Sequence, residues 1–139
     1  RKAALAHAED IARRVGLAGQ LDKPAQDLTI AGRKRLELAR ALATEPKLLL
    51  LDEVLAGLNP QEVAEMSPVI RAIRDGGVTV LMIEHVMQAV MNLSEHAWVL
   101  NNGRLIAEGK PFDVLRDPRV IEAYLGRGAA ERLRAQAHA

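Results

Sequence analysis

The chain has 139 residues and is 49% hydrophobic, which is enough to bury the core of one domain or of part of one. Its 19 Lys and Arg nearly balance 18 Asp and Glu, so the formal net charge of +1 gives no field that would hold a nucleic acid. Cysteine is absent and no apolar stretch approaches the roughly 18 residues of a membrane span, so we expect no disulfide, no thiolate metal site and a cytoplasmic chain.

The N-terminal third is predicted to be helical. Apolar residues recur at helical spacing from Ala4 to Val15, and Gly16 ends that helix. Leu17 to Ala31 contains Gly, Pro and Asp without a clear period and is expected to be a loop with a short turn. Gly32 to Thr44 is predicted as a second helix that ends before Pro46. Four basic residues are expected on the exposed sides of this helix: Arg33, Lys34, Arg35 and Arg40.

A strand, a helix and a second strand follow. Leu48 to Leu51 is a continuous apolar run, which is typical of a strand buried on both faces of a parallel sheet. Asn59 and Pro60 predict a helix start, with Asn59 as the N-cap, and the helix should run to about Arg74. Val78 to Ile83 is the second buried strand. This order predicts an α/β unit with a right-handed crossover.

The C-terminal part is predicted to hold a hairpin among short helices. Val86 to Leu93 has the pattern of a helix, and Ala97 to Leu100 and Arg104 to Glu108 are predicted as two strands. The dipeptide Asn102-Gly103 between them is a strong hairpin signal. Two short helices that begin with proline and one terminal helix are expected at Pro111 to Leu115, Pro118 to Leu125 and Ala129 to Ala137.

Polar residues follow both predicted parallel strands. Asp52-Glu53 and Glu84-His85 stand at carboxyl ends, so all four side chains are expected to converge on one crevice. Mg²⁺ takes one or two carboxylates, which suits Asp52, and hydrolysis needs a group that orients water, which suits Glu53. His85 would hydrogen-bond a γ-phosphate or the attacking water. Each of these residues also has a plainer explanation when it is taken singly. Asp52 would be a turn residue, Glu53 a solvated charge and His85 a histidine at a helix start.

The pattern of a phosphate-binding loop is missing. No G-x-x-x-x-G-K-[ST] segment occurs among the 139 residues. The chain therefore carries residues suited to hydrolysis without the loop that would hold the phosphates. Since it also begins at Arg1 rather than Met, we expect it to be part of a longer protein.

Four motifs in order resemble those of ABC-type ATPases, the nucleotide-binding subunits of ATP-driven membrane transporters. Leu28 to Leu42 is similar to the family signature L-S-G-G-Q and the helix after it, which ends in A-R-A-L. Leu48 to Glu53 resembles the Walker B strand, Leu55 to Pro60 the D-loop, and His85 the switch histidine. The resemblance implies an α/β fold: part of a P-loop NTPase (RecA-like) core with parallel strands, part of the ABC helical subdomain, and a C-terminal hairpin plus short helices.

The resemblance also implies three parts and a shared ligand. Residues 1–44 would be a remnant of the helical subdomain, 45–110 the second half of the ATPase core, and 111–139 a C-terminal helical tail. Two ATPase domains of this family pair head to tail, so in the full-length parent the signature would contact ATP that the partner holds. The resemblance also implies Mg²⁺, which Asp52 would bind through water. The residues implied in this contact are Thr29, Ile30, Ala31 and Gly32, with Asn59 in the D-loop.

This sequence departs from the family pattern at two places. Where the signature has Ser, Gly, Gly and Gln, the chain has Thr29, Ile30, Ala31 and Gly32. Thr29 keeps a hydroxyl, with helix capping as the plain alternative, whereas Ala31 adds a Cβ where the backbone would approach a phosphate. Asn59 replaces the usual D-loop aspartate, so it keeps the capping role and loses the charge.

Three segments resemble the ATPases of branched-chain amino acid importers: residues 53–60, 84–87 and 120–126. The resemblance implies that the full-length parent hydrolyses MgATP to power import, lies on the inner face of the cell membrane, and binds a second ATPase subunit and permease subunits. No nucleic acid partner is expected. A urea or amide importer is the alternative within the same family.

Two other functions stay open on the sequence alone. One is a soluble ABC ATPase of DNA repair or translation, and the other is a non-catalytic binding module in which Asp52-Glu53 is vestigial. Without a phosphate loop, the 139 residues by themselves are expected neither to bind ATP with useful affinity nor to hydrolyse it. Uncovered sheet edges would favour pairing with a second copy.

Overall fold

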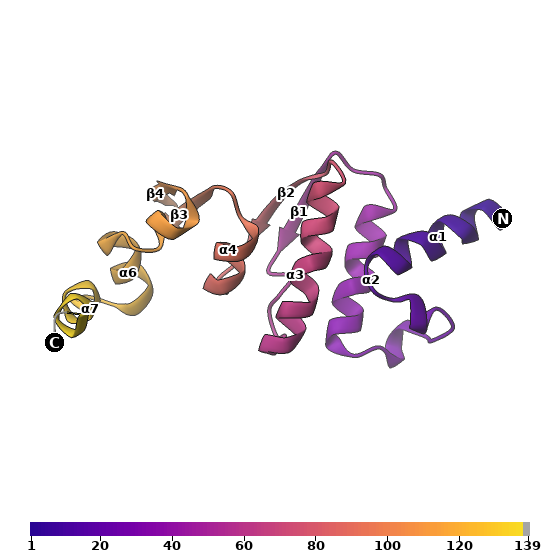
Figure 1. Cartoon of the computed structure of the whole chain (residues 1–139), viewed down its shortest axis with the longest axis horizontal. Coiled ribbons are helices and arrows are strands. Elements are labelled where there is room, and N and C mark those ends of the chain that lie inside the picture. The colour runs from indigo at the N-terminus through magenta and orange to yellow at the C-terminus, as the bar shows by residue number, and fades with distance from the viewer. Residues whose placement is uncertain (138–139) are drawn as a thin grey trace. The chain divides into compact units, whose positions relative to one another are not determined.

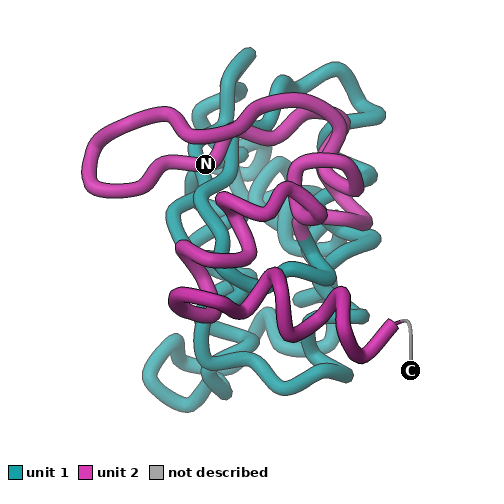
Figure 2. The backbone as a smooth tube through the Cα atoms, turned by 90° about the vertical axis from the view of Figure 1, so that its left-hand side faces the viewer, with its two compact units in different colours: residues 1–89 teal, residues 90–139 magenta. Residues whose placement is uncertain are grey.

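The computed structural model describes residues 1–137. Its backbone divides into two compact units, residues 1–89 and residues 90–139, which Figure 2 shows in two colours. The three-part division that the family resemblance implies stays a prediction. Among the described helices, none has both the length and the apolar composition that crossing a bilayer requires.

Unit 1 begins with two helices joined by short 3-10 turns (Figure 1). The predicted helices are both present, as α1 (Lys2–Arg14) and α2 (Ile30–Leu42), with η1 (Ala18–Gln20) and η2 (Ala25–Asp27) between them. Helix α2 begins two residues before the predicted start because Thr29 is its N-cap: the Thr29 hydroxyl oxygen accepts from the Gly32 amide at 3.1 Å.

Arg35 is not exposed as the sequence analysis expected. Its side chain is only 14% exposed, and one guanidinium nitrogen donates to the Val15 carbonyl at 2.8 Å while another lies 3.8 Å from a Glu65 carboxylate oxygen. Gly16 suits this position for two reasons. Its φ of +81° favours glycine, and a Cβ there would collide with the Arg35 guanidinium. Arg35 therefore ties the end of α1 to α2 and α3 (Pro60–Asp75).

The predicted order of strand, helix and strand is confirmed, and the right-handed crossover stays a prediction. Strands β1 (Leu48–Asp52) and β2 (Thr79–Ile83) pair in parallel, from Leu48 opposite Thr79 to Asp52 opposite Ile83, and α3 connects them. The predicted N-cap is also present: the Asn59 side chain accepts from the Glu62 amide, and the Glu62 carboxylate accepts from the Asn59 amide, each at 2.9 Å.

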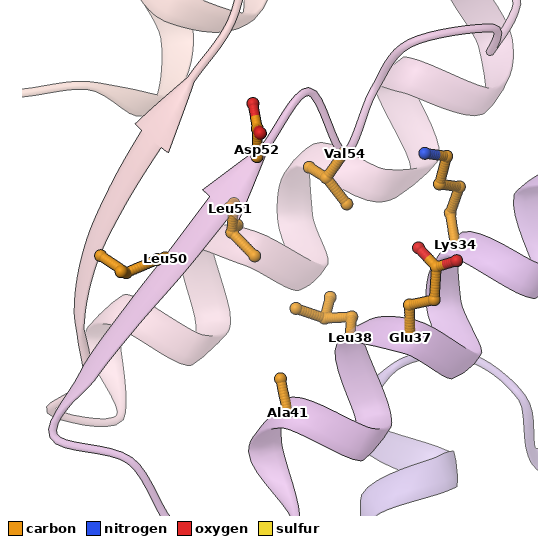
Figure 3. Close-up of a pocket in the computed structure, with 8 residues that line it drawn as sticks. All are labelled: Lys34, Glu37, Leu38, Ala41, Leu50, Leu51, Asp52 and Val54. Carbon is orange, nitrogen blue, oxygen red and sulfur yellow. The ribbon is translucent and has the colours of Figure 1, made fainter.

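The prediction that both strands are buried is wrong for the described residues: β1 is buried on one face only, and no residue of β2 is fully buried. Leu49 and Leu51 are buried, as are three residues of α3, whereas Leu48 and Leu50 are exposed. Figure 3 shows the cause on the side of α2: Leu51 points toward Leu38 and Ala41 of that helix, whereas Leu50 points away from them. The α3 residues in this core are Met66, Ile70 and Ile73.

Unit 2 consists of a hairpin and short helices, as predicted. Strands β3 (Ala97–Asn101) and β4 (Arg104–Gly109) pair antiparallel with a bulge after Val99. Asn102 and Gly103 have φ of 50° and 75°, the left-handed conformations that a tight hairpin turn needs. Helix α4 (Met87–Leu93) spans the boundary between the units, and three helices follow the hairpin: α5 (Pro111–Val114), α6 (Pro118–Leu125) and α7 (Ala129–Ala137).

Candidate nucleotide-hydrolysis site

The carboxyl ends of β1 and β2 lie side by side in unit 1. Asp52 is opposite Ile83 in the parallel register, and the pairing continues for one more residue, since the Glu53 amide donates to the Ile83 carbonyl at 2.9 Å. This alignment puts the residues that follow the two strands next to each other. The residues concerned, Glu53 and His85, are far apart in the sequence but meet at one edge of the sheet.

Glu53 and His85 are in contact. A Glu53 carboxylate oxygen lies 3.5 Å from Nδ1 of His85, and the two side chains are 53% and 57% exposed. Because water screens a pair that is this exposed, it contributes less than about 1 kcal/mol to stability even when the histidine is protonated. The contact therefore serves better to orient two polar groups toward a common ligand than to hold the fold together.

The backbone of Glu53 is strained. Its φ is 50°, in the left-handed region that residues with a Cβ seldom occupy. Such a conformation costs on the order of 1–3 kcal/mol and persists only where the surroundings enforce it. It turns the chain sharply at the end of β1, and the next turn begins there, with the Ala56 amide donating to the Glu53 carbonyl at 3.0 Å.

Asp52 ends β1 on the exposed face of the strand. Figure 3 shows its carboxylate at the end of β1, beside a cavity of about 140 Å³ between α2 and β1 into which Leu38, Leu51 and Val54 point. In residues 1–137 no group of three or more His, Asp or Glu side chains converges as a metal cage would require. A single exposed carboxylate fits Mg²⁺ that is held mainly by water and substrate phosphates.

The signature segment is organised by its own helix. Thr29 caps α2 through its hydroxyl oxygen, so the capping role is observed, and the hydroxyl hydrogen can still donate to another group. Ile30 is exposed and Ala31 half-buried, whereas Gly32 is buried where an added Cβ would lie 3.2 Å from Cβ of Leu28. The contact of these residues with a nucleotide stays a prediction, as does a role of Asn59 beyond its cap.

Glu84 does not face the crevice as the sequence analysis expected. One of its carboxylate oxygens instead accepts from the Leu55 amide at 3.0 Å, and the other is buried. The sequence carried no signal for this contact, since Glu84 and Leu55 are 29 positions apart. Of the four polar residues predicted to converge, the structure thus brings Glu53 and His85 into contact, while Asp52 precedes Glu53 at the end of β1 and Glu84 holds the loop after β1.

Family models match two parts of the chain. A model described as ABC transporter matches residues 2–56, and one described as branched-chain amino acid ATP-binding cassette transporter matches residues 104–130. The high-affinity branched-chain amino acid transport ATP-binding protein LivG of Escherichia coli K12 is 41% identical over 114 residues, 81% of this chain. The chain belongs to the ABC transporter ATP-binding family.

Other members of the ABC family show how far the likeness extends. BraF of Pseudomonas aeruginosa, also a branched-chain amino acid transport ATP-binding protein, is 42% identical over 81% of this chain and 44% of BraF. LptB of Escherichia coli K12, the ATP-binding protein of a lipopolysaccharide export system, is 40% identical over 76% of this chain and 44% of LptB. The chain spans about half the length of these relatives, 45% in the case of LivG.

Solved ABC structures share the fold. The ADP conformation of MJ1267, an ATP-binding cassette of an ABC transporter, matches with a TM-score of 0.84 and 33% identity over 91% of this chain and 52% of that chain. CbiO1 from Clostridium perfringens, part of the ABC transporter complex cbiONQ, matches with a TM-score of 0.75 and 28% identity over 96% of this chain and 53% of that chain. The predicted fold class is thereby confirmed.

Proposed function

We propose that this chain carries the hydrolytic half of the nucleotide site of an ABC ATPase that powers import of branched-chain amino acids. The observation that carries the proposal is the contact between Glu53 and His85, 3.5 Å apart at the carboxyl ends of two paired parallel strands. Ligands of open α/β sheets bind at this edge, and a carboxylate and an imidazole there are the groups that activate water beside a phosphate.

Each residue of the site has a separate role in this proposal. Glu53 orients the attacking water and accepts its proton as the water oxygen bonds to the γ-phosphorus and the bond to the bridging oxygen breaks. His85 donates a hydrogen bond to a γ-phosphate oxygen. Asp52 would hold Mg²⁺ through water, and the chemistry that Mg²⁺ supplies when bound is to neutralise charge on the phosphates.

The signature is proposed to act on a nucleotide held by a second ATPase domain. The hydroxyl hydrogen of Thr29 and the first turn of α2 are the available donors, because the amides at a helix N-terminus favour an anion. The lack of a Cβ at Gly32 is not by itself a reason to expect a phosphate close to this residue. Gly32 is buried, and its amide already donates to the Thr29 hydroxyl oxygen. Ile30, Ala31 and Asn59 would line the same dimer contact.

The substrate class rests on the C-terminal match. Residues 104–130 match the branched-chain amino acid model, and both LivG and BraF carry that transport function in their names. LptB, of similar identity, is named for lipopolysaccharide export, so identity over the rest of the chain does not set the substrate. A urea or amide importer is the second candidate, because importers of that kind share much of the same sequence pattern.

The proposal includes partners and a place in the cell. The complete ATPase would bind permease subunits and lie on the cytoplasmic side of the cell membrane, as part of an importer. The 139 residues alone would self-associate through the exposed face of β1 and β2, which presents Leu48, Leu50, Leu81 and Ile83. Sedimentation at high concentration would detect this, and a compact monomer there would contradict it.

The test begins with the chain by itself. Because its sequence has no phosphate loop, calorimetric titration with MgATP should show no binding in the micromolar range and no hydrolysis should be detected. A hybrid should then recover hydrolysis. In this hybrid, the part of Escherichia coli LivG that precedes the matched region is joined to the N-terminus of this chain.

The hybrid separates the proposed function from a non-catalytic one. His85→Ala should lower kcat by about 10²-fold, because a donor to the reacting phosphate is lost. Glu131→Ala, an exposed change on α7, is the matched control and should leave kcat unchanged. A hybrid that binds MgATP but does not hydrolyse it would favour the non-catalytic binding module instead.

A further inference from the structure

We infer that Glu84 is a positioning residue: it fixes the loop after β1 against the end of β2 and so holds Glu53 beside His85. The inference rests on the proposed function, which gives Glu53 and His85 their roles. Glu84 lies outside the residues that the two family models match. The inference is based on the hydrogen bonds of the loop after β1.

Two hydrogen bonds connect the loop after β1 to the end of β2. The Glu53 amide donates to the Ile83 carbonyl at 2.9 Å, and the Leu55 amide donates to a Glu84 carboxylate oxygen at 3.0 Å. Alternate residues of the loop are thus held by consecutive residues of the neighbouring strand end. The first bond continues the sheet, but the second exists only because position 84 has a side chain of this length that ends in an acceptor.

Without the Glu84 carboxylate, the Leu55 amide would be left without a hydrogen-bond acceptor. Leu55 is 1% exposed, so water does not reach its backbone, and a buried N–H that loses its acceptor is strongly disfavoured. Packing alone does not account for a glutamate here. Its second carboxylate oxygen is buried without a donor among residues 1–137, which an apolar side chain of similar size would avoid.

The anchor acts on the candidate site through the backbone. Glu53 has a φ of 50°, a conformation that the surroundings must enforce, and the bonds at residues 53 and 55 lie on both sides of the sharp turn that it makes. His85 directly follows Glu84 in the chain, so the residue that holds the loop also carries the site's histidine. Release of the Leu55 amide would free the loop and separate Glu53 from His85.

The first experiment measures the anchor in the chain as it stands. Glu84→Ala removes the acceptor, Glu84→Asp keeps the charge but withdraws it by one methylene, and Glu84→Gln keeps an oxygen at the same reach. The Leu55 amide should exchange with solvent about tenfold faster in the Ala and Asp variants, and the His85 ring-proton signals should shift. Glu84→Gln should restore most of both, and Glu131→Ala should change neither.

Core amides report whether the variants fold. Protection of the Leu38 and Ile70 amides should persist, which separates local release of the loop from unfolding. If Glu84→Ala fails to fold, Glu84→Asp and Glu84→Gln carry the test. An unchanged Leu55 exchange rate in Glu84→Asp would overturn the inference.

The second experiment uses the hybrid with LivG. Glu84→Asp should lower kcat by about tenfold or more, because a displaced Glu53 no longer holds water in line, while KM for ATP stays within about twofold. Glu84→Gln should recover kcat to within about threefold. If the hybrid hydrolyses MgATP and Glu84→Asp does not lower kcat, the inference fails while the proposed function stands. If the unmodified hybrid is inactive, the proposed function fails and Leu55 exchange decides whether Glu84 anchors the loop.

Discussion

On one face of β1, Leu49 and Leu51 are buried beneath the helices of unit 1, whereas on the other face Leu48 and Leu50 are exposed, Leu50 to 66%. The four residues are chemically identical, so the strand's own sequence does not distinguish its faces. The distinction comes from the helices, since Leu38 and Ala41 of α2 lie on the side of Leu51 (Figure 3) and α3 adds three buried residues to the core. A leucine run thus predicts a strand, and its surroundings decide what each leucine contributes.

The two faces also differ in what they offer to other molecules. Asp52 lies on the exposed face, together with Leu48 and Leu50, and Leu81 and Ile83 of β2 are exposed as well. The buried face stabilises unit 1, while the exposed face combines an apolar surface with a carboxylate at its end. That combination suits a surface that another polypeptide covers up to the edge of the candidate site.

The largest expected effect comes from truncating one leucine on each face. Leu51→Ala should lower the free energy of unfolding by about 2–5 kcal/mol, because it leaves a cavity in a packed core. Leu50→Ala should change it by less than about 0.5 kcal/mol. Urea denaturation of the two variants measures this contrast, and equal losses would remove the distinction between the faces. A larger loss for Leu50→Ala in the LivG hybrid would show that the added part covers the exposed face.

A second contrast of buried against exposed lies on α2. Arg35→Met should cost about 1.5–3 kcal/mol, since the Val15 carbonyl loses a charged donor while the apolar stem is kept. Arg40→Met on the exposed side is the matched control and should cost less than about 0.5 kcal/mol. Thermal unfolding of the pair measures the difference. Equal shifts in Tm would mean that the Arg35 contact does not join the three helices.

Glu53 tests whether strain is stored where β1 ends. Glu53→Gly should be more stable than Glu53→Ala by about 1 kcal/mol, because glycine adopts a φ of 50° without the clash of a Cβ. Urea denaturation of both variants provides the comparison. If the alanine variant is the more stable, the left-handed backbone conformation at this position stores no strain energy.

The smallest effect is expected at the cap of α6 in unit 2, where Asp117 is the N-cap residue. Hydrogen bonds from the Arg119 side chain and then its backbone amide hold the pKa of Asp117 below the ordinary 3.8. Since the folded-state pKa is lowered, this stabilisation is complete above pH 3.8 and is lost as the pH falls through the folded value. Asp117→Asn should give a slightly flatter Tm profile between about pH 6 and about pH 3. An unchanged profile would show that Asp117 does not contribute.

The sequence predicted what depends on neighbours along the chain. Asn59 caps α3, Asn102 and Gly103 form the hairpin turn, and α6 has its predicted bounds, because capping and turn residues act within a few positions. The meeting of Glu53 with His85 was also predictable, since parallel strands align their carboxyl ends.

Tertiary contacts account for what the sequence did not predict. Arg35 is buried because the end of α1 and a glutamate of α3 lie beside it, although its position on α2 allowed exposure. The left-handed backbone of Glu53 and the turn of Glu84 toward Leu55 depend on how two strand ends meet. Neither leaves a periodic or local signal in the chain.

The most direct test of the account is ATP hydrolysis by the LivG hybrid with and without Glu53→Gln, with nucleotide binding measured in parallel. Loss of the carboxylate that accepts a proton from water should lower kcat by about 10²-fold or more, while MgATP still binds within about twofold of the unmodified affinity. Hydrolysis by Glu53→Gln at the unmodified rate would contradict the account, because the carboxylate beside His85 would then have no part in the reaction.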